Sequence, residues 1–266
     1  MSLNTFQQDI FNLLILGSFS ENQVNIKWDP SLRMLPAALV AKIANYWNKE
    51  IVQTPKANYL FNGDLCRLNN WEVTQNRLNL HLGRTNYKEL LYSNCFVQDI
   101  ITRFGIEYLS KALGISAVLV SYDQNIVLIE RSENVGEYPK RLDVLGGHIH
   151  PVDHAVSGVP NPFYAIKTEL QEEVNLQVGP NEPVTCLGVI ETRATKKPEL
   201  VFLVKSQKTS DEILKCSVSR KTRELTRVFT IENRLNLLTS FLSNKKDQLS
   251  PSAYGSLWLY AQILKK

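Results

Sequence analysis

Residues 168–176 read TELQEEVNL and place Glu169, Glu172 and Glu173 at positions i, i+3 and i+4. On an α-helix this spacing gathers the three carboxylates within about 100° of arc, so that they share one face. Neighbouring anions repel one another, and they are tolerated when water solvates them or when a divalent cation binds among them. The stretch therefore predicts either a solvated acidic helix face or a metal site.

The residues before and within this stretch predict an amphipathic helix. Asn161 followed by Pro162 is typical of an N-cap and the first helical position. An apolar stripe lies beside the carboxylates and consists of Phe163, Ile166, Leu170 and Val174. We expect this stripe to dock the helix on a sheet, with the carboxylates on its shoulder and facing outward.

A glycine turn upstream favours the metal site over the solvated face. Gly146, Gly147 and His148 follow the strand-like run 142–145. Glycine lets a backbone carbonyl approach an ion closely. Magnesium takes oxygen ligands and often bridges protein carboxylates and substrate phosphates.

The chain around this helix predicts an α+β fold, with a mixed sheet flanked by helices. Strand-like runs lie at 117–122, 126–131, 186–190, 200–204 and 225–231, and a closing helix is expected from Pro251. Residues 123–125 separate the first two runs, which is typical of a hairpin.

The N-terminal half has a different pattern. We expect a helix over 35–50, strands at 59–61 and 78–82, and a turn at 83–87 before another helix. The apolar run 11–16 is too short for a membrane span and predicts a core strand or helix. We therefore predict two domains, a smaller α+β domain over 1–114 that contributes to substrate binding and a second domain over 115–266.

Composition limits the function classes. The 266 residues are 44% hydrophobic and 21% charged, with a formal net charge of +4, as in many globular proteins. Lys and Arg are scattered, which argues against a nucleic-acid partner. The four cysteines are far apart and form no CxxC pair, so we expect reduced thiols and no zinc site. We expect a cytoplasmic protein without a membrane partner, and the sequence leaves its oligomeric state open.

Taken together, the glycine turn and the acidic helix resemble the motif of the Nudix hydrolases, GX5EX7REUXEEXGU. Thr168 stands at the motif arginine and Asn175 at its second glycine. The segment from Gly147 to Glu169 is seven residues longer than the usual spacing, and Asp153 takes the place of the first glutamate. The resemblance implies a Nudix α/β/α sandwich with a mixed sheet, and a Nudix hydrolase domain over 115–266.

Three further segments resemble the nudix motif 22 type, whose members are UDP-glucose pyrophosphatases. They are LGRTNYKELL at 82–91, LDVLGGH at 142–148 and PSAYG at 251–255. The resemblance implies hydrolysis of the pyrophosphate bond of UDP-sugars, UDP-glucose or UDP-galactose, to UMP and sugar 1-phosphate. It also implies Mg²⁺ as cofactor, with Mn²⁺ as a substitute, and a small nucleotide sugar as partner.

The same resemblance assigns candidate site residues. Glu169, Glu172 and Glu173 would be the catalytic acids that bind the metal and activate water, with the Gly147 carbonyl as a further ligand. Candidate substrate-binding residues are cations suited to phosphate and members of the N-terminal signature. They are Thr85, Tyr87, Asn94, Arg131, Arg141, His148 and Arg193. Glu199 is an extra acid whose position is more typical of a surface glutamate at a strand end.

Two other functions stay open. The same chemistry could act on ADP-ribose, a dinucleotide or coenzyme A, or the chain could be a catalytically silent module that binds nucleotide sugars. Thr168 in place of the motif arginine favours the silent module. The three adjacent like charges argue against it, because a silent domain has no need to keep them.

Overall fold

The computed structural model describes residues 9–218 and 224–265. Its largest element is a mixed sheet of eight strands, bounded as follows. They are β1 (Phe11–Phe19), β5 (Gly114–Val120), β6 (Asn125–Arg131), β7 (Leu142–Asp143), β8 (Leu145–His148), β11 (Val184–Thr192), β12 (Pro198–Lys205) and β13 (Leu225–Glu232). The strand order is β1-β11-β12-β5-β6-β13, and β7 and β8 pair with β6 and β5. Only β12 and β5 run parallel among the described pairs of this sheet.

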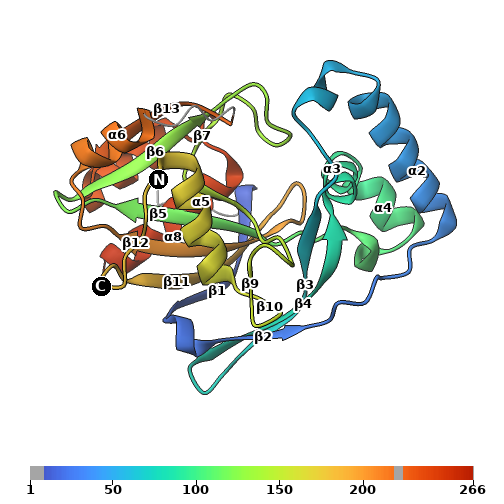
Figure 1. Cartoon of the computed structure of the whole chain (residues 1–266), viewed down its shortest axis with the longest axis horizontal. Helices are drawn as coiled ribbons and strands as arrows, with labels where there is room; N and C mark the ends of the chain where they lie inside the picture. The colour runs from blue at the N-terminus through green and yellow to red at the C-terminus, as the bar shows by residue number, and fades with distance from the viewer. Residues whose placement is uncertain (1–8, 219–223, 266) are drawn as a thin grey trace.

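Helices cover both faces of this sheet (Figure 1). The helices α5 (Pro162–Val174) and α6 (Ser210–Val218) pack on one face, and α7 (Leu235–Asn244) and α8 (Pro251–Leu264) pack on the other. Side chains along β5 point alternately to the two faces of the sheet. Ile115 therefore packs in the core beneath α5, and Val118 packs in the core beneath α8. The predicted α+β class is confirmed, and the arrangement is an α/β/α sandwich.

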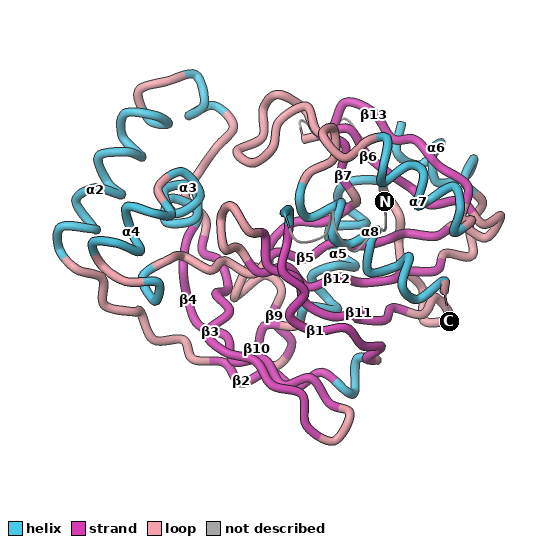
Figure 2. The backbone as a smooth tube through the Cα atoms, turned by 180° about the vertical axis from the view of Figure 1, so that it is seen from behind, coloured by secondary structure: helices cyan, strands magenta, loops and turns pink. Residues whose placement is uncertain are grey.

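The N-terminal part adds a second, smaller sheet with its own helices. Its elements are β2 (Val24–Trp28), α2 (Ala37–Trp47), β3 (Asp64–Thr74), β4 (Arg77–Asn86), α3 (Tyr87–Cys95) and α4 (Val97–Arg103). Short helical turns lie at Glu21–Gln23, Asn48–Val52, Pro55–Asn58 and Ile106–Tyr108, and a two-stranded ribbon joins β9 (Ala155–Val156) to β10 (Val159–Pro160). Figure 2 shows the three helices at one end of the molecule, the sandwich at the other, and β3 and β4 between them.

A backbone hydrogen bond joins the two parts. The Cys66 N–H, on β3, donates to the Ile149 carbonyl, directly after β8, at 2.8 Å. The strand β1 comes from the N-terminal half, yet it pairs with β11 in the large sheet. The segment Phe11–Phe19 therefore crosses the predicted division at residue 114, and that division stays a prediction for the residues from β2 onward.

Most expected elements are present, with two corrections. The run 59–61 is not a strand, because it follows the Pro55–Asn58 turn and pairs with none of the strands that the structure describes. Residues 83–86 are not a turn, because β4 continues through them in register with β3, and Asp64 pairs with Asn86. Cross-strand pairing overrides the turn preference of Gly83, and the helix α3 begins at Tyr87 as expected. In the described part of the chain, no helix combines the length and apolar character needed to cross a bilayer.

Candidate functional site

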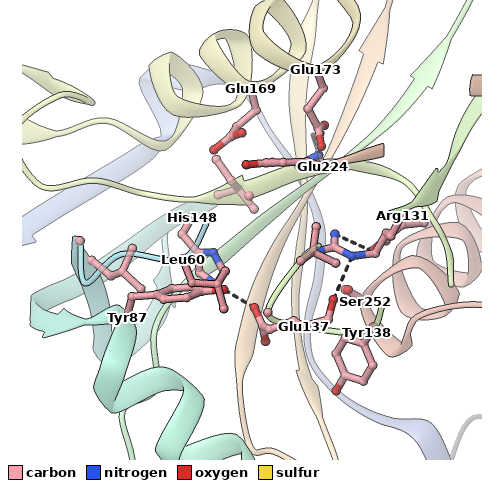
Figure 3. A pocket seen from close by; sticks show the side chains of 18 of the residues that line it. Leu60, Tyr87, Arg131, Glu137, Tyr138, His148, Glu169, Glu173, Glu224 and Ser252 are labelled. Atoms are coloured by element: carbon pink, nitrogen blue, oxygen red, sulfur yellow. Dashed lines mark hydrogen bonds and ion pairs between the residues drawn. The ribbon is translucent and has the colours of Figure 1, made fainter. Parts of the chain in front are cut away.

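A cavity of about 790 Å³ lies where the two parts of the molecule meet. Its walls are the acidic helix α5, the strand β8, the loop 134–138 and the N-terminal loop 57–61. Figure 3 shows Glu169 and Glu173 on one side of the cavity and Glu137 and Tyr138 on the other. A cavity of this size can bury a small-molecule ligand.

The helix α5 places its three glutamates differently. Glu173 is only 5% exposed, and its Oε2 accepts a hydrogen bond from the Gly146 N–H at 2.8 Å. Glu169 lies against Gly147, where an added Cβ would come within 2.3 Å of Oε1. Glu172 is exposed and lines the cavity rim. The expectation that all three face outward is wrong for Glu173, because its hydrogen bond to the glycine turn draws it inward.

Burial and neighbouring carboxylates raise the pKa of two acids on this wall. Burial is the main cause for Glu169, and the nearby Glu172 and Glu224 add to it, so that its pKa rises to about 8. Burial and the charge of Glu169 raise the pKa of Glu173 well above its ordinary value. Without a cation the raised pKa values favour the protonated acids at neutral pH, and a bound cation would favour their ionised forms.

The donor chemistry of this wall fits a hard divalent cation. Carboxylate oxygens of Glu169, Glu172 and Glu173 and the Gly147 carbonyl are ligands of the kind that Mg²⁺ prefers. In the residues that the structure describes, however, no three His, Cys, Asp or Glu side chains converge closely enough to hold a metal ion. The assignment of these four ligands therefore stays a proposal.

A second charged group lines the cavity, and we name it the glutamate–lysine cluster: Glu137, His148, Lys197 and Glu199. The Lys197 Nζ lies 3.1 Å from Glu137 Oε2 and 3.6 Å from Glu199 Oε2. The His148 Nε2 lies 3.4 Å from Glu137 Oε2. The expectation of a surface position for Glu199 is wrong, because the residue is 3% exposed and accepts a hydrogen bond from Ser116 at 2.6 Å.

The cluster fixes the charge of its members. Burial opposes the charge of Glu137, but Lys197, His148 and Arg131 lower its pKa to about 2. Burial opposes the charge of Lys197 too, and the two glutamates raise its pKa above the ordinary value. Burial and the charge of Lys197 lower the pKa of His148 to about 3. At neutral pH the cluster therefore holds an ionised Glu137, a charged Lys197 and a neutral His148.

Sequence reasoning missed Glu137 and Lys197. Neither belongs to a recognisable motif. They lie 60 positions apart in the chain, and they meet because the loop 134–138 lies against the residue that precedes β12. The one available signal was local, because Lys197 and Glu199 stand at i and i+2 before the predicted strand 200–204.

Three of the predicted substrate-binding residues line the cavity: Tyr87, Arg131 and His148. The Arg131 Nη1 lies 3.2 Å from Asp143 Oδ2, and its Nε donates to the Glu137 carbonyl at 3.0 Å. The Tyr87 hydroxyl packs over Gly136, where an added Cβ would come within 2.1 Å of it. These contacts hold the loop 134–138 against both halves of the molecule.

The other four predicted substrate-binding residues are not among the cavity-lining residues. The Thr85 hydroxyl is buried against Ser110 and Glu89, and Asn94 donates to Glu137 Oε1 at 2.8 Å from behind the cavity wall. Arg141 and Arg193 are exposed, and the Arg193 Nε donates to Asn12 at 2.9 Å. Asn94 therefore supports the glutamate–lysine cluster, and direct substrate contact by these four stays a prediction.

Several known proteins are similar to the chain, although no family model matches it. The uridine diphosphate glucose pyrophosphatase NUDT22 of Mus musculus is 28% identical over 92% of this chain and 87% of its own length. The protein of the same name from Homo sapiens is 26% identical over 93% of this chain and 90% of its own length. Nudix hydrolase 9 of Arabidopsis thaliana is 22% identical over 94% of this chain and 89% of its own length.

Solved structures of other proteins are similar to the chain at lower coverage. The MutT protein from Methanosarcina mazei Go1 has a TM-score of 0.42 and 15% identity, over 58% of this chain and 95% of its own. DR0079 from Deinococcus radiodurans has a TM-score of 0.39 and 15% identity, over 56% of this chain and 82% of its own. The curated relatives confirm the predicted resemblance to this type of Nudix hydrolase and the hydrolase class that it implies.

Proposed function

We propose that this relative of the Nudix hydrolases cleaves the pyrophosphate bond of UDP-sugars such as UDP-glucose and UDP-galactose, using Mg²⁺ or Mn²⁺. Water would add to one phosphorus and the bridging P–O bond would break, which gives UMP and sugar 1-phosphate. One observation carries the proposal. The similarity to two UDP-glucose pyrophosphatases covers more than nine-tenths of the chain, so that it includes the segments from both halves that line the cavity.

The residues of the helix α5 and the glycine turn would carry the reaction. A bound divalent cation would neutralise the diphosphate and lower the pKa of the attacking water. Glu169, Glu172, Glu173 and the Gly147 carbonyl would hold that cation. The hydrogen bond from Gly146 to Glu173 fixes the turn against the helix. Thr168 stands at the position of the motif arginine but does not fix the turn, because its hydroxyl donates to the Tyr164 carbonyl of its own helix.

A substrate panel tests the proposal directly. The full chain is incubated with Mg²⁺ and UDP-glucose, UDP-galactose, GDP-mannose, ADP-ribose or coenzyme A, and phosphate is measured after treatment with a phosphatase. We expect the highest kcat/KM with a UDP-sugar and no turnover in excess EDTA. Preference for ADP-ribose would overturn the substrate assignment. Binding of UDP-glucose without turnover of any compound would indicate the silent module.

A further inference from the structure

The glutamate–lysine cluster lies on the opposite face of the sheet from the acids of the helix α5. In β8, Gly147 faces Glu169, so its neighbours Gly146 and His148 face the other way. His148 pairs with Gly114 of β5, and Gly114 pairs with Glu199 of β12, so these three residues form one row across the sheet. The cavity therefore has two separate polar walls, one formed by the acids of α5 and one by the cluster.

The cluster has buried polar atoms that make no hydrogen bond. Among the described residues, neither Glu199 Oε2 nor His148 Nε2 has a hydrogen-bond partner. Oε2 of Glu199 lies 3.6 Å from the Lys197 ammonium, and Nε2 of His148 lies 3.4 Å from Glu137 Oε2. The Glu199 carboxylate is fixed in place, because its other oxygen accepts the bond from Ser116 and Gly114 leaves room beneath it. A buried acceptor that makes no hydrogen bond costs free energy, which a donor from a ligand or water would lower.

The charge of the cluster selects the kind of ligand. Glu137 and Glu199, when ionised, carry two negative charges, and Lys197 carries one positive charge, so the cluster is not a phosphate site. A neutral hydroxyl group matches it better. Such a group can donate to Glu199 Oε2 and accept from the Lys197 ammonium or from His148, and neighbouring hydroxyls of one ring can use several of these atoms. The rings of Tyr87 and Tyr138 line the cavity as well.

We infer that the glutamate–lysine cluster binds the hydroxyl groups of the glycosyl part of the substrate, with Glu199 as the principal acceptor. This inference rests on the proposed function, because it assigns the sugar of a nucleotide sugar to one wall and its diphosphate to the other. Glu199 thereby determines specificity for a hydroxyl-rich leaving group and takes no part in bond cleavage.

The test separates sugar recognition from nucleotide binding. Steady-state kinetics with UDP-glucose, and inhibition by UMP, are measured for the wild type and for Glu199→Gln. Gln keeps the volume and the contact with Ser116 but replaces the free acceptor by a donor next to Lys197. We expect KM for UDP-glucose to rise about tenfold or more, with kcat within about threefold and the Ki of UMP within about twofold. Glu191→Gln, on the neighbouring strand β11 and outside the cavity, should match the wild type.

Each other outcome overturns the inference. Unchanged KM, an equal loss for UDP-glucose and UMP, or a fall in kcat alone would each exclude sugar recognition by Glu199. If Glu199→Gln does not fold, as judged by its thermal melt, Ser116→Ala releases the carboxylate instead and must raise the same KM. If the wild type turns over no UDP-sugar, the proposed function fails, and calorimetry then tests the subsite alone. In that case, equal affinities of the protein for UDP-glucose and UMP would overturn the assignment of the sugar to the cluster.

Discussion

Glu173 is the residue at which the proposed chemistry depends most on a single charge. Its carboxylate is buried between Gly146 and Glu169, and burial disfavours its ionised form in the absence of a cation. We expect Glu173→Gln to lower kcat at least about 100-fold, because it removes a metal-binding charge but keeps the side-chain volume. The melting temperature should not fall, since Gln needs no protonation to be buried and its amide oxygen can still accept from Gly146.

Turnover of UDP-glucose and thermal melting of Glu173→Gln check this prediction. Glu72→Gln, an exposed substitution on β3, is the control and should leave both quantities unchanged. A fully active Glu173→Gln would contradict the proposed assignment of the acids on α5.

The lowered pKa of Glu137 predicts how the free energy of unfolding depends on pH. Its pKa in the folded protein is about 2, below the ordinary value of 4.5. A group whose pKa is lowered by folding stabilises the fold at pH values above its ordinary pKa. For Glu137 this contribution disappears as the pH falls from about 4.5 to about 2. The contribution is at most on the order of 3 kcal/mol. Glu137→Gln should therefore lower the free energy of unfolding at pH 7 and lower it much less at pH 2.

Urea unfolding of the wild type and of Glu137→Gln at a series of pH values measures that difference. Taking the difference cancels the contributions of the other carboxylates, which titrate in both proteins. A difference that stays constant from pH 7 to pH 2 would contradict the ion pair of Glu137 with Lys197.

The packing of α5 on the β8 turn makes a prediction at the scale of elements. Gly146 has a φ of 154°, and a Cβ there would come within 2.0 Å of the Ile115 carbonyl oxygen. A Cβ at Gly147 would instead meet only the end of the Glu169 side chain, which can move. We expect Gly146→Ala to destabilise the fold by about 2 kcal/mol or more. Gly147→Ala should fold normally but lose at least about tenfold in kcat, because it displaces Glu169.

Each glycine variant serves as the control for the other. Chemical denaturation gives the free energy of unfolding, and UDP-glucose turnover gives kcat. Equal stability of the two variants would show that the turn tolerates a side chain at Gly146, and an unaffected kcat in Gly147→Ala would separate Glu169 from the reaction.

Local elements could be predicted from the sequence, whereas their long-range register could not. The N-cap at Asn161 and the helices that begin at Pro162 and Pro251 depend on adjacent residues, and all are present. The pairing of β1 with β11 joins residues that lie more than 160 positions apart, so no local pattern indicates it. The same limit explains the cavity. The acids of α5 were visible as i, i+3 and i+4 spacing, while the glutamate–lysine cluster exists only because distant segments meet.

At the scale of the whole molecule, β1 attaches the start of the chain to its end. Phe11 opens this strand, is 1% exposed, and packs its ring edge-on against Trp258 of the closing helix α8, with centroids 5.6 Å apart. Without this contact the edge of β11 and the aromatic face of α8 would be less well covered. The sandwich that carries α5 therefore depends on a strand from outside the predicted domain 115–266.

We expect Phe11→Ala to lower the free energy of unfolding by about 3–5 kcal/mol, since it leaves a cavity between β1 and α8. Phe61→Ala is the matched control, because the same truncation at a residue that is 79% exposed should change stability by less than about 0.5 kcal/mol. Urea denaturation of the full chain measures both, and the cooperativity of the transition shows whether the parts unfold together. Loss of stability in Phe61→Ala alone would contradict the packing argument for Phe11. A second unfolding step confined to Phe11→Ala would mean that the half of the molecule that carries α5 is stable without β1. A single cooperative transition at lower urea is the result that a sheet shared between the two halves requires.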